Sequence, residues 1–122
     1  MFEKYSGTLN DGNPGDTLTP GTRPCLVDAI FDLTNLLNAG DDFELSISVG
    51  AGGSERVVAY YGVTSDGTDL FIDPGSGVPA AVAVRRLGVS GLLVADDEVV
   101  KLDYVKNSAN SRDIAYYAVT KI

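Results

Sequence analysis

The sequence contains one nine-residue stretch in two copies, RVVAYYGVT at residues 56–64 and RDIAYYAVT at residues 112–120. Six of the nine positions are identical, at an offset of 56 residues. Both copies are rich in tyrosine and β-branched side chains, which favour strands. Because internal self-similarity indicates a repeated structural unit, this stretch predicts a chain built from two similar halves, each ending in a strand.

The similarity continues outward at the same offset. Leu36-Leu37 matches Leu92-Leu93, and the register slips by one residue between the helix and the strand predicted to follow it. We therefore predict one domain over residues 1–122, which contains repeat halves at 21–64 and 77–120.

Residues 1–20 precede the first half and are expected to form a strand or arm followed by a flexible loop. Residues 2–9 are rich in strand formers, whereas residues 10–23 have the Gly, Pro, Asn and Asp content of turns. Long loops are often functional. Residues 10–23 are therefore either a surface loop or an arm that contacts a neighbouring subunit.

A helix is predicted to open the first half, between a capping Thr22 and a terminating Gly40. The apolar residues of this segment fall on one helical stripe: Leu26, Ala29, Ile30, Leu33 and Leu37. By the repeat, residues 79–94 should hold a second helix. Their valines and glycines are poor helix formers, so a strand over 81–87 is the competing interpretation.

Strands are predicted to follow each helix. Apolar and polar residues alternate over 43–49, and a glycine-rich turn at 50–55 leads into the strand at 56–64. Residues 99–105 and 112–122 are predicted to form the last hairpin. The predicted fold class is α+β: two pseudo-symmetric halves, each a helix plus an antiparallel hairpin, forming a mostly antiparallel sheet with one or two helices.

The tyrosine strands are apolar on both faces, because alternate residues of a strand point to opposite sides. A two-layer domain usually leaves one face of a strand polar, and tyrosines are enriched at interfaces. One interpretation is an interface; the other is that the N-terminal strand and loop cover the second face. The candidate interface residues are Tyr60, Tyr61, Tyr116, Tyr117, Arg56 and Arg112.

The composition favours no catalytic, metal or cofactor chemistry. The chain has no histidine and one cysteine, Cys25, which is expected to be a buried structural thiol. Serine–histidine, cysteine–histidine and zinc chemistry therefore have no candidates. The paired carboxylates are better explained by turn capping and a solvated helix face: Asp41 and Asp42, Asp96 and Asp97, Asp28 and Asp32. We expect no enzyme, no cofactor and no metal.

The charge balance bears on the choice of partner. Nine basic residues among seventeen acidic ones give a net charge of −8, which disfavours direct binding to nucleic acid or an anionic membrane. No apolar run is long enough to span a membrane, and the N-terminus lacks the pattern of a signal peptide. The expected location is a virion or the cytoplasm.

The predicted order of helix and strands, written twice, is similar to one domain of a sliding clamp. The opening Met1-Phe2-Glu3 and the ending at residues 116–122 also resemble that family. The resemblance implies its topology only, because clamp helices that face DNA are basic and the helix predicted here has Asp28 and Asp32 instead.

These observations predict a structural or assembly protein that associates with itself or with another structural protein. A small virion component, such as a phage capsid, decoration or tail protein, fits this description. The alternative is an acidic interaction module that binds a basic protein surface, for example as a nucleic-acid mimic inhibitor; a mimic would need its carboxylates gathered on one face. A small-molecule carrier, with a pocket between the halves, is a third possibility.

Overall fold

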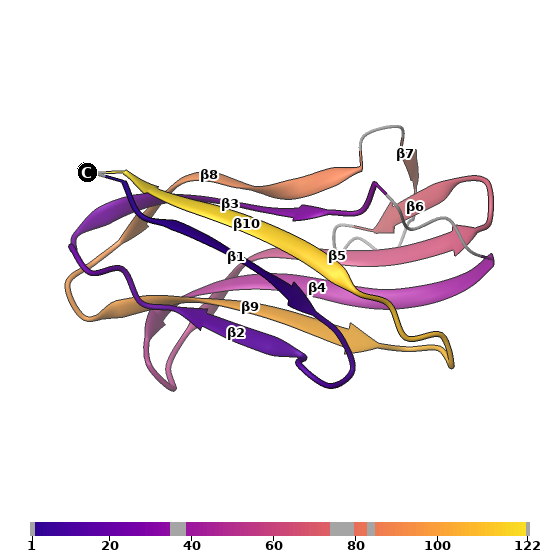
Figure 1. Ribbon diagram of the computed structural model, residues 1–122, viewed down its shortest axis with the longest axis horizontal. Helices are drawn as coiled ribbons and strands as arrows, with labels where there is room; N and C mark the ends of the chain where they lie inside the picture. The colour runs from indigo at the N-terminus through magenta and orange to yellow at the C-terminus, as the bar shows by residue number, and fades with distance from the viewer. Residues whose placement is uncertain (1, 35–38, 74–79, 83–84, 122) are drawn as a thin grey trace.

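The computed structural model describes residues 2–34, 39–73, 80–82 and 85–121. These residues form ten strands and no helix (Figure 1). In chain order the strands are β1 (Lys4–Leu9), β2 (Gly15–Leu18), β3 (Cys25–Asp32), β4 (Ala39–Ala51), β5 (Arg56–Asp66), β6 (Leu70–Asp73), β7 (Ala80–Val82), β8 (Arg86–Val94), β9 (Glu98–Lys106) and β10 (Ile114–Lys121).

The strands form two antiparallel sheets, which lie as two layers in Figure 1. The four-stranded sheet has the order β1-β10-β3-β8, and the six-stranded sheet has the order β2-β9-β4-β5-β6-β7. Strand pairing is nested: β1 pairs with β10, β2 with β9, β3 with β8 and β4 with β5. Successive pairs alternate between the sheets, which is the topology of a jelly roll. Strands β6 and β7 extend the larger sheet beyond β5.

The core lies between the two sheets and is filled by alternate residues of their strands. The largest fully buried side chains come from both sheets: Phe31, Phe43, Leu9, Leu33, Leu45, Ile47, Leu70, Leu102 and Ile114. The rings of Phe43 and Tyr104 pack with their centroids 5.6 Å apart. Each such side chain contributes about 1.5–3 kcal/mol by leaving water, so this layer supplies much of the driving force for folding.

The predicted α+β class is wrong, and the first error is the helix over 22–40. Its central part is β3, where Cys25, Val27, Ala29 and Phe31 are buried with period two. The expected helical stripe mixes the two faces of this strand, since Leu26 is 42% exposed while Ala29 is 1% exposed. Leu37 lies outside the described residues. Pairing with β10 and β8 on either side decides the outcome.

The predicted second helix is also wrong. The described parts of residues 79–94 belong to β7 and β8, and the competing strand over 81–87 covers only fragments of these. Two positions of β8 require glycine, one for a close backbone approach and one for a positive φ. A Cβ at Gly88 would lie 1.9 Å from the backbone oxygen of Ala29, and Gly91 has a φ of +67° beside the register shift between Val27 and Ala29.

Of the two predicted hairpins, the structure contains the first and not the second. The first hairpin is confirmed, because β4 pairs with β5 across the turn at 52–55. The last hairpin is wrong: β9 pairs with β2 and β4, whereas β10 pairs with β1 and β3 in the other sheet. Without helices, the described residues do not have the order of elements on which the likeness to a sliding clamp depended.

The N-terminal segment is part of both sheets. Strand β1 is confirmed close to its predicted bounds and forms the edge of the four-stranded sheet beside β10. Residues 10–23 hold a tight turn closed by two backbone hydrogen bonds between Asn10 and Asn13, followed by β2 at the edge of the six-stranded sheet.

Candidate functional site

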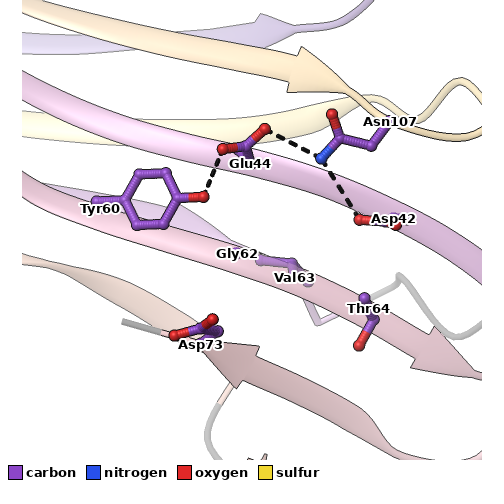
Figure 2. A pocket seen from close by; sticks show the side chains of 8 residues that line it. All are labelled: Asp42, Glu44, Tyr60, Gly62, Val63, Thr64, Asp73 and Asn107. Atoms are coloured by element: carbon purple, nitrogen blue, oxygen red, sulfur yellow. Dashed lines mark hydrogen bonds between the residues drawn. The ribbon is translucent and has the colours of Figure 1, made fainter. Parts of the chain in front are cut away.

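A pocket of about 220 Å³ lies on the outer face of the six-stranded sheet. Strand β4 supplies Asp42 and Glu44, β5 supplies Tyr60 and Thr64, and β6 supplies Asp73 (Figure 2). The remaining lining residues are Gly62, Val63 and Asn107. Strands β4 and β6, which lie on either side of β5, therefore bring together carboxylates that are up to 31 residues apart in the sequence.

Hydrogen bonds hold Glu44 between a phenol and an amide. Tyr60 donates its hydroxyl to one oxygen of Glu44, and the Nδ2 of Asn107 donates to the other at 3.0 Å (Figure 2). Asn107 also donates to Asp42 Oδ1 at 3.5 Å. The hydrogen bond to Glu44, followed by burial, raises the pKa of Tyr60 to about 12, because a phenolate would lose that bond and stand beside a carboxylate.

Among the described residues, the pocket is lined by three acidic side chains and no basic one. Such a surface can accept hydrogen bonds or a positively charged group from a partner. Within the described residues, no group of three or more His, Cys, Asp or Glu side chains has the arrangement of a metal site.

The four candidate tyrosines are divided between the interior and the surface. Tyr116 is 5% exposed and donates to Asp16 Oδ2 at 2.7 Å across the core. Tyr61 points inward and donates to the backbone oxygen of Gly88 at 3.1 Å. Tyr60 and Tyr117 point outward and are 36% and 49% exposed. One tyrosine of each copy is therefore at the surface: the first of the pair in β5 and the second of the pair in β10.

The two candidate arginines bind carboxylates of their own chain. Arg112 Nε lies 2.8 Å from Oδ1 of Asp41, whose side chain is fully buried. Arg56 forms a 3.3 Å ion pair with Glu98 while its own side chain stays 65% exposed. Arg112 is therefore a structural residue, and Arg56 lies at the surface.

An exposed apolar group lies on the outer face of the four-stranded sheet, mostly at positions the sequence analysis did not select. It consists of Phe2, Leu26, Leu93 and Tyr117, which are 42–67% exposed. Leu26 and Leu93 pair directly across β3 and β8, and Tyr117 pairs with Ile30. The signal available in the sequence was the run over 25–31, whose strand alternation leaves Leu26 and Ile30 on the face opposite Val27 and Phe31.

Asp28 and Asp32, which were predicted to lie on a helix, point outward from β3. Asp28 pairs with Lys121 and accepts the Gly91 N–H at 2.8 Å, contacts that lower its pKa, with the Lys121 bond the largest cause. Asp32 accepts hydrogen bonds from Thr34, which lower its pKa, and lies 3.7 Å from Arg86. Both carboxylates therefore hold local structure.

Cys25 is confirmed as a buried free thiol, 4% exposed at the start of β3. Burial raises its pKa, with a further contribution from Glu3. A raised pKa leaves less thiolate and therefore less nucleophilic character.

Comparisons with known proteins identify no family. No protein-family model matches the chain, and no curated protein matches it. A solved structure described as "Cyanophage Pam1 capsid asymmetric unit" contains a chain with 18% sequence identity and a TM-score of 0.43, over 98% of this chain and 81% of that one. Identity and TM-score at this level establish neither a family nor a function. The described residues include no helix long and apolar enough to cross a membrane.

Proposed function

We propose that this protein is a structural or assembly protein, a small virion component of the capsid, decoration or tail type. It acts by associating with further copies of itself or with another structural protein. The supporting observation is the exposed apolar group on the four-stranded sheet, Phe2, Leu26, Leu93 and Tyr117. Leu26 and Leu93 are direct neighbours across β3 and β8, and contiguous exposed apolar surface marks interaction sites.

The rigidity of the scaffold also suits this role. Leu26, Leu93 and Tyr117 project from paired strands, so the backbone that carries them is ordered before any partner binds, which lowers the entropic cost of association. The jelly roll itself does not select the function, because the same architecture serves viral capsid and lectin domains alike.

A second candidate function is an acidic module that binds a basic protein surface. The observation that favours it is the pocket of Asp42, Glu44 and Asp73, which gathers carboxylates on one face, as a mimic of nucleic acid would require. It differs from self-assembly in one measurable respect, because such a module need not associate with itself.

Light scattering across a concentration series, with negative-stain imaging of the same samples, tests the proposal. We expect a mass above that of the 12.8 kDa monomer, growing into a defined oligomer, ring, shell or filament. Tyr117→Ser should lower that mass without changing the circular dichroism spectrum, since the side chain is 49% exposed. A strict monomer at all concentrations would contradict self-association and favour the acidic module.

A further inference from the structure

The exposed apolar side chains lie on both outer faces of the molecule. We call the outward side chains of β1, β10, β3 and β8, together with Phe2, the four-strand face, and those of the six-stranded sheet the six-strand face. Phe2 belongs to the first because backbone and side-chain hydrogen bonds between Glu3 and Thr120 extend the β1–β10 pairing, and Phe2 is in phase with the outward Lys4.

Each face has the same number of exposed large apolar residues within the described part of the chain. The four-strand face has Phe2, Leu26, Leu93 and Tyr117, and the six-strand face has Val57, Val58, Tyr60 and Val105. Val57 and Val58 lie where the register between β4 and β5 shifts, and Val105 pairs with the pocket residue Glu44.

The two faces differ in charge. In the outward phase of its strands, the four-strand face has three basic residues, Lys4, Arg86 and Lys121, and two acidic ones, Asp28 and Asp32, a balance of +1. The six-strand face has one basic residue, Lys101, and five acidic ones, a balance of −4: Asp42, Glu44, Asp66, Asp73 and Asp103. The net charge of −8 is therefore unevenly distributed over the molecule.

We propose that copies of this chain associate head to tail, with the four-strand face of one copy on the six-strand face of the next. This inference rests on the proposed function and specifies its interface. Pairing two six-strand faces would oppose −4 with −4, and pairing two four-strand faces would oppose +1 with +1. Only the mixed contact joins opposite charges while it covers both apolar groups, and like charges across an interface are costly.

A head-to-tail contact has a structural consequence. It uses two different surfaces of each copy, so every bound copy still presents one free face of each kind. Such heterologous contacts generate a ring if the rotation closes and an open filament if it does not. A face-to-face contact would instead stop at a dimer.

Two single-face variants test the arrangement. Leu93→Glu places a negative charge on the four-strand face, and Val57→Lys places a positive charge on the six-strand face. The two side chains are matched in exposure, 59% and 62%, so neither substitution should affect folding. Ser54→Glu, at an exposed residue of the β4–β5 turn, is the control, and Leu26→Glu with Val105→Lys is a second pair should either variant fold poorly.

The expected result is that wild type and Ser54→Glu form higher oligomers and each single-face variant alone is monomeric. An equimolar mixture of the two variants should form a dimer of one copy of each and nothing larger, because one intact contact remains between them. Light scattering and native mass spectrometry would measure this.

Other outcomes separate the inference from the proposed function. Dimers formed by Val57→Lys alone would show that two four-strand faces pair with each other. Dimers formed by Leu93→Glu alone would show that two six-strand faces pair. Either result would overturn head-to-tail association and leave self-assembly intact. Oligomers unchanged in both variants would place the contact elsewhere on the molecule and overturn the inference. A monomeric wild type would overturn the inference together with self-association.

Discussion

Strands β5 and β10 contain nearly the same sequence but bury opposite tyrosines. In β5, Tyr60 points to solvent and Tyr61 points inward, whereas in β10 Tyr116 is buried and Tyr117 is 49% exposed. The strands also lie in different sheets. Side chains alternate along a strand, so a shift of one residue exchanges its faces. A segment that is apolar on both faces therefore does not determine which face points inward.

The environments of the two strands explain the choice. Strand β10 lies between β1 and β3, and the hydroxyl of Tyr116 donates a hydrogen bond to Asp16 on β2 of the opposite sheet. Strand β5 lies between β4 and β6, and its outward Tyr60 donates a hydrogen bond to Glu44 at the surface. Each phenol has a carboxylate partner, but the ring of Tyr116 is buried beside a half-buried Asp16, whereas Tyr60 and Glu44 are at the rim of a pocket.

The largest effect should come from truncating the equivalent tyrosines. Tyr116→Ala should lower the free energy of unfolding by about 3–5 kcal/mol, because it leaves a cavity in the core. Tyr60→Ala, at the matching repeat position, should cost less than about 1 kcal/mol. Urea unfolding monitored by circular dichroism measures both. Equal losses would show that the two copies do not differ in burial, and a large loss for Tyr116 would rule out that residue as an interface probe.

A smaller effect is expected at the two arginines of the repeat, which differ in the burial of their carboxylate partners. Arg112→Ala should cost about 2–3 kcal/mol, because the fully buried carboxylate of Asp41 would lose its ion pair with a half-buried arginine. Arg56→Ala should cost about 1 kcal/mol or less, since its pair with Glu98 is largely solvated. The same denaturation assay compares them, with Arg56→Lys and Arg112→Lys as charge-preserving controls. A small effect at Arg112 would contradict the burial of this pair.

Alkaline pH should produce the smallest difference. The pKa of Tyr116 is raised to about 12, first by burial and then by its bond to Asp16. A raised folded-state pKa means that this stabilisation is present below the unfolded value near 10 and is lost as pH rises through 12. The free energy of unfolding should thus fall between about pH 10 and pH 12, with Tyr116 contributing on the order of 2 kcal/mol.

Phenylalanine variants assign the alkaline loss. Tyr116→Phe should remove that part of the pH dependence, measured as urea unfolding at about pH 8 and about pH 11. Tyr60→Phe should change it little, because Tyr60 is 36% exposed and solvent screens its interaction with Glu44. An unchanged pH profile for Tyr116→Phe would show that this phenol ionises without cost to the fold.

Local sequence pattern predicted several strands correctly. The same pattern did not exclude the two helices that were wrongly predicted. Residues 43–49 alternate clearly, and the strand there is confirmed as the centre of β4. Residues 25–33 fit a helical stripe and a strand alternation equally well, because apolar residues occupy both phases. The strand formed because β8 and β10, more than 50 residues away, supply its hydrogen-bonding partners.

The candidate interface could be predicted only in part. Tyr60 and Tyr117 are at the surface as an interface requires, whereas Tyr116 is buried and Arg112 is held by the buried carboxylate of Asp41. Phe2 and Leu93 had no local signal that distinguished them from core residues, and the alternation that places Leu26 outside applies only because residues 25–31 form a strand. The pairing of Leu26 with Leu93 joins distant segments of the chain. The carboxylates Asp42, Glu44 and Asp73 meet because the consecutive strands β4, β5 and β6 pair in a fixed register.

Four features of this protein follow from local pattern or composition and could be predicted from the sequence. They are the duplicated tyrosine stretch, the hairpin at 43–64, the strand near the N-terminus and the strongly acidic balance. Only the tertiary structure decided that the fold is a jelly roll, which tyrosine of each copy is buried, and how charge divides between the two outer faces. Those outcomes depend on pairing between distant strands, and a strand with two apolar faces takes its orientation from its neighbours.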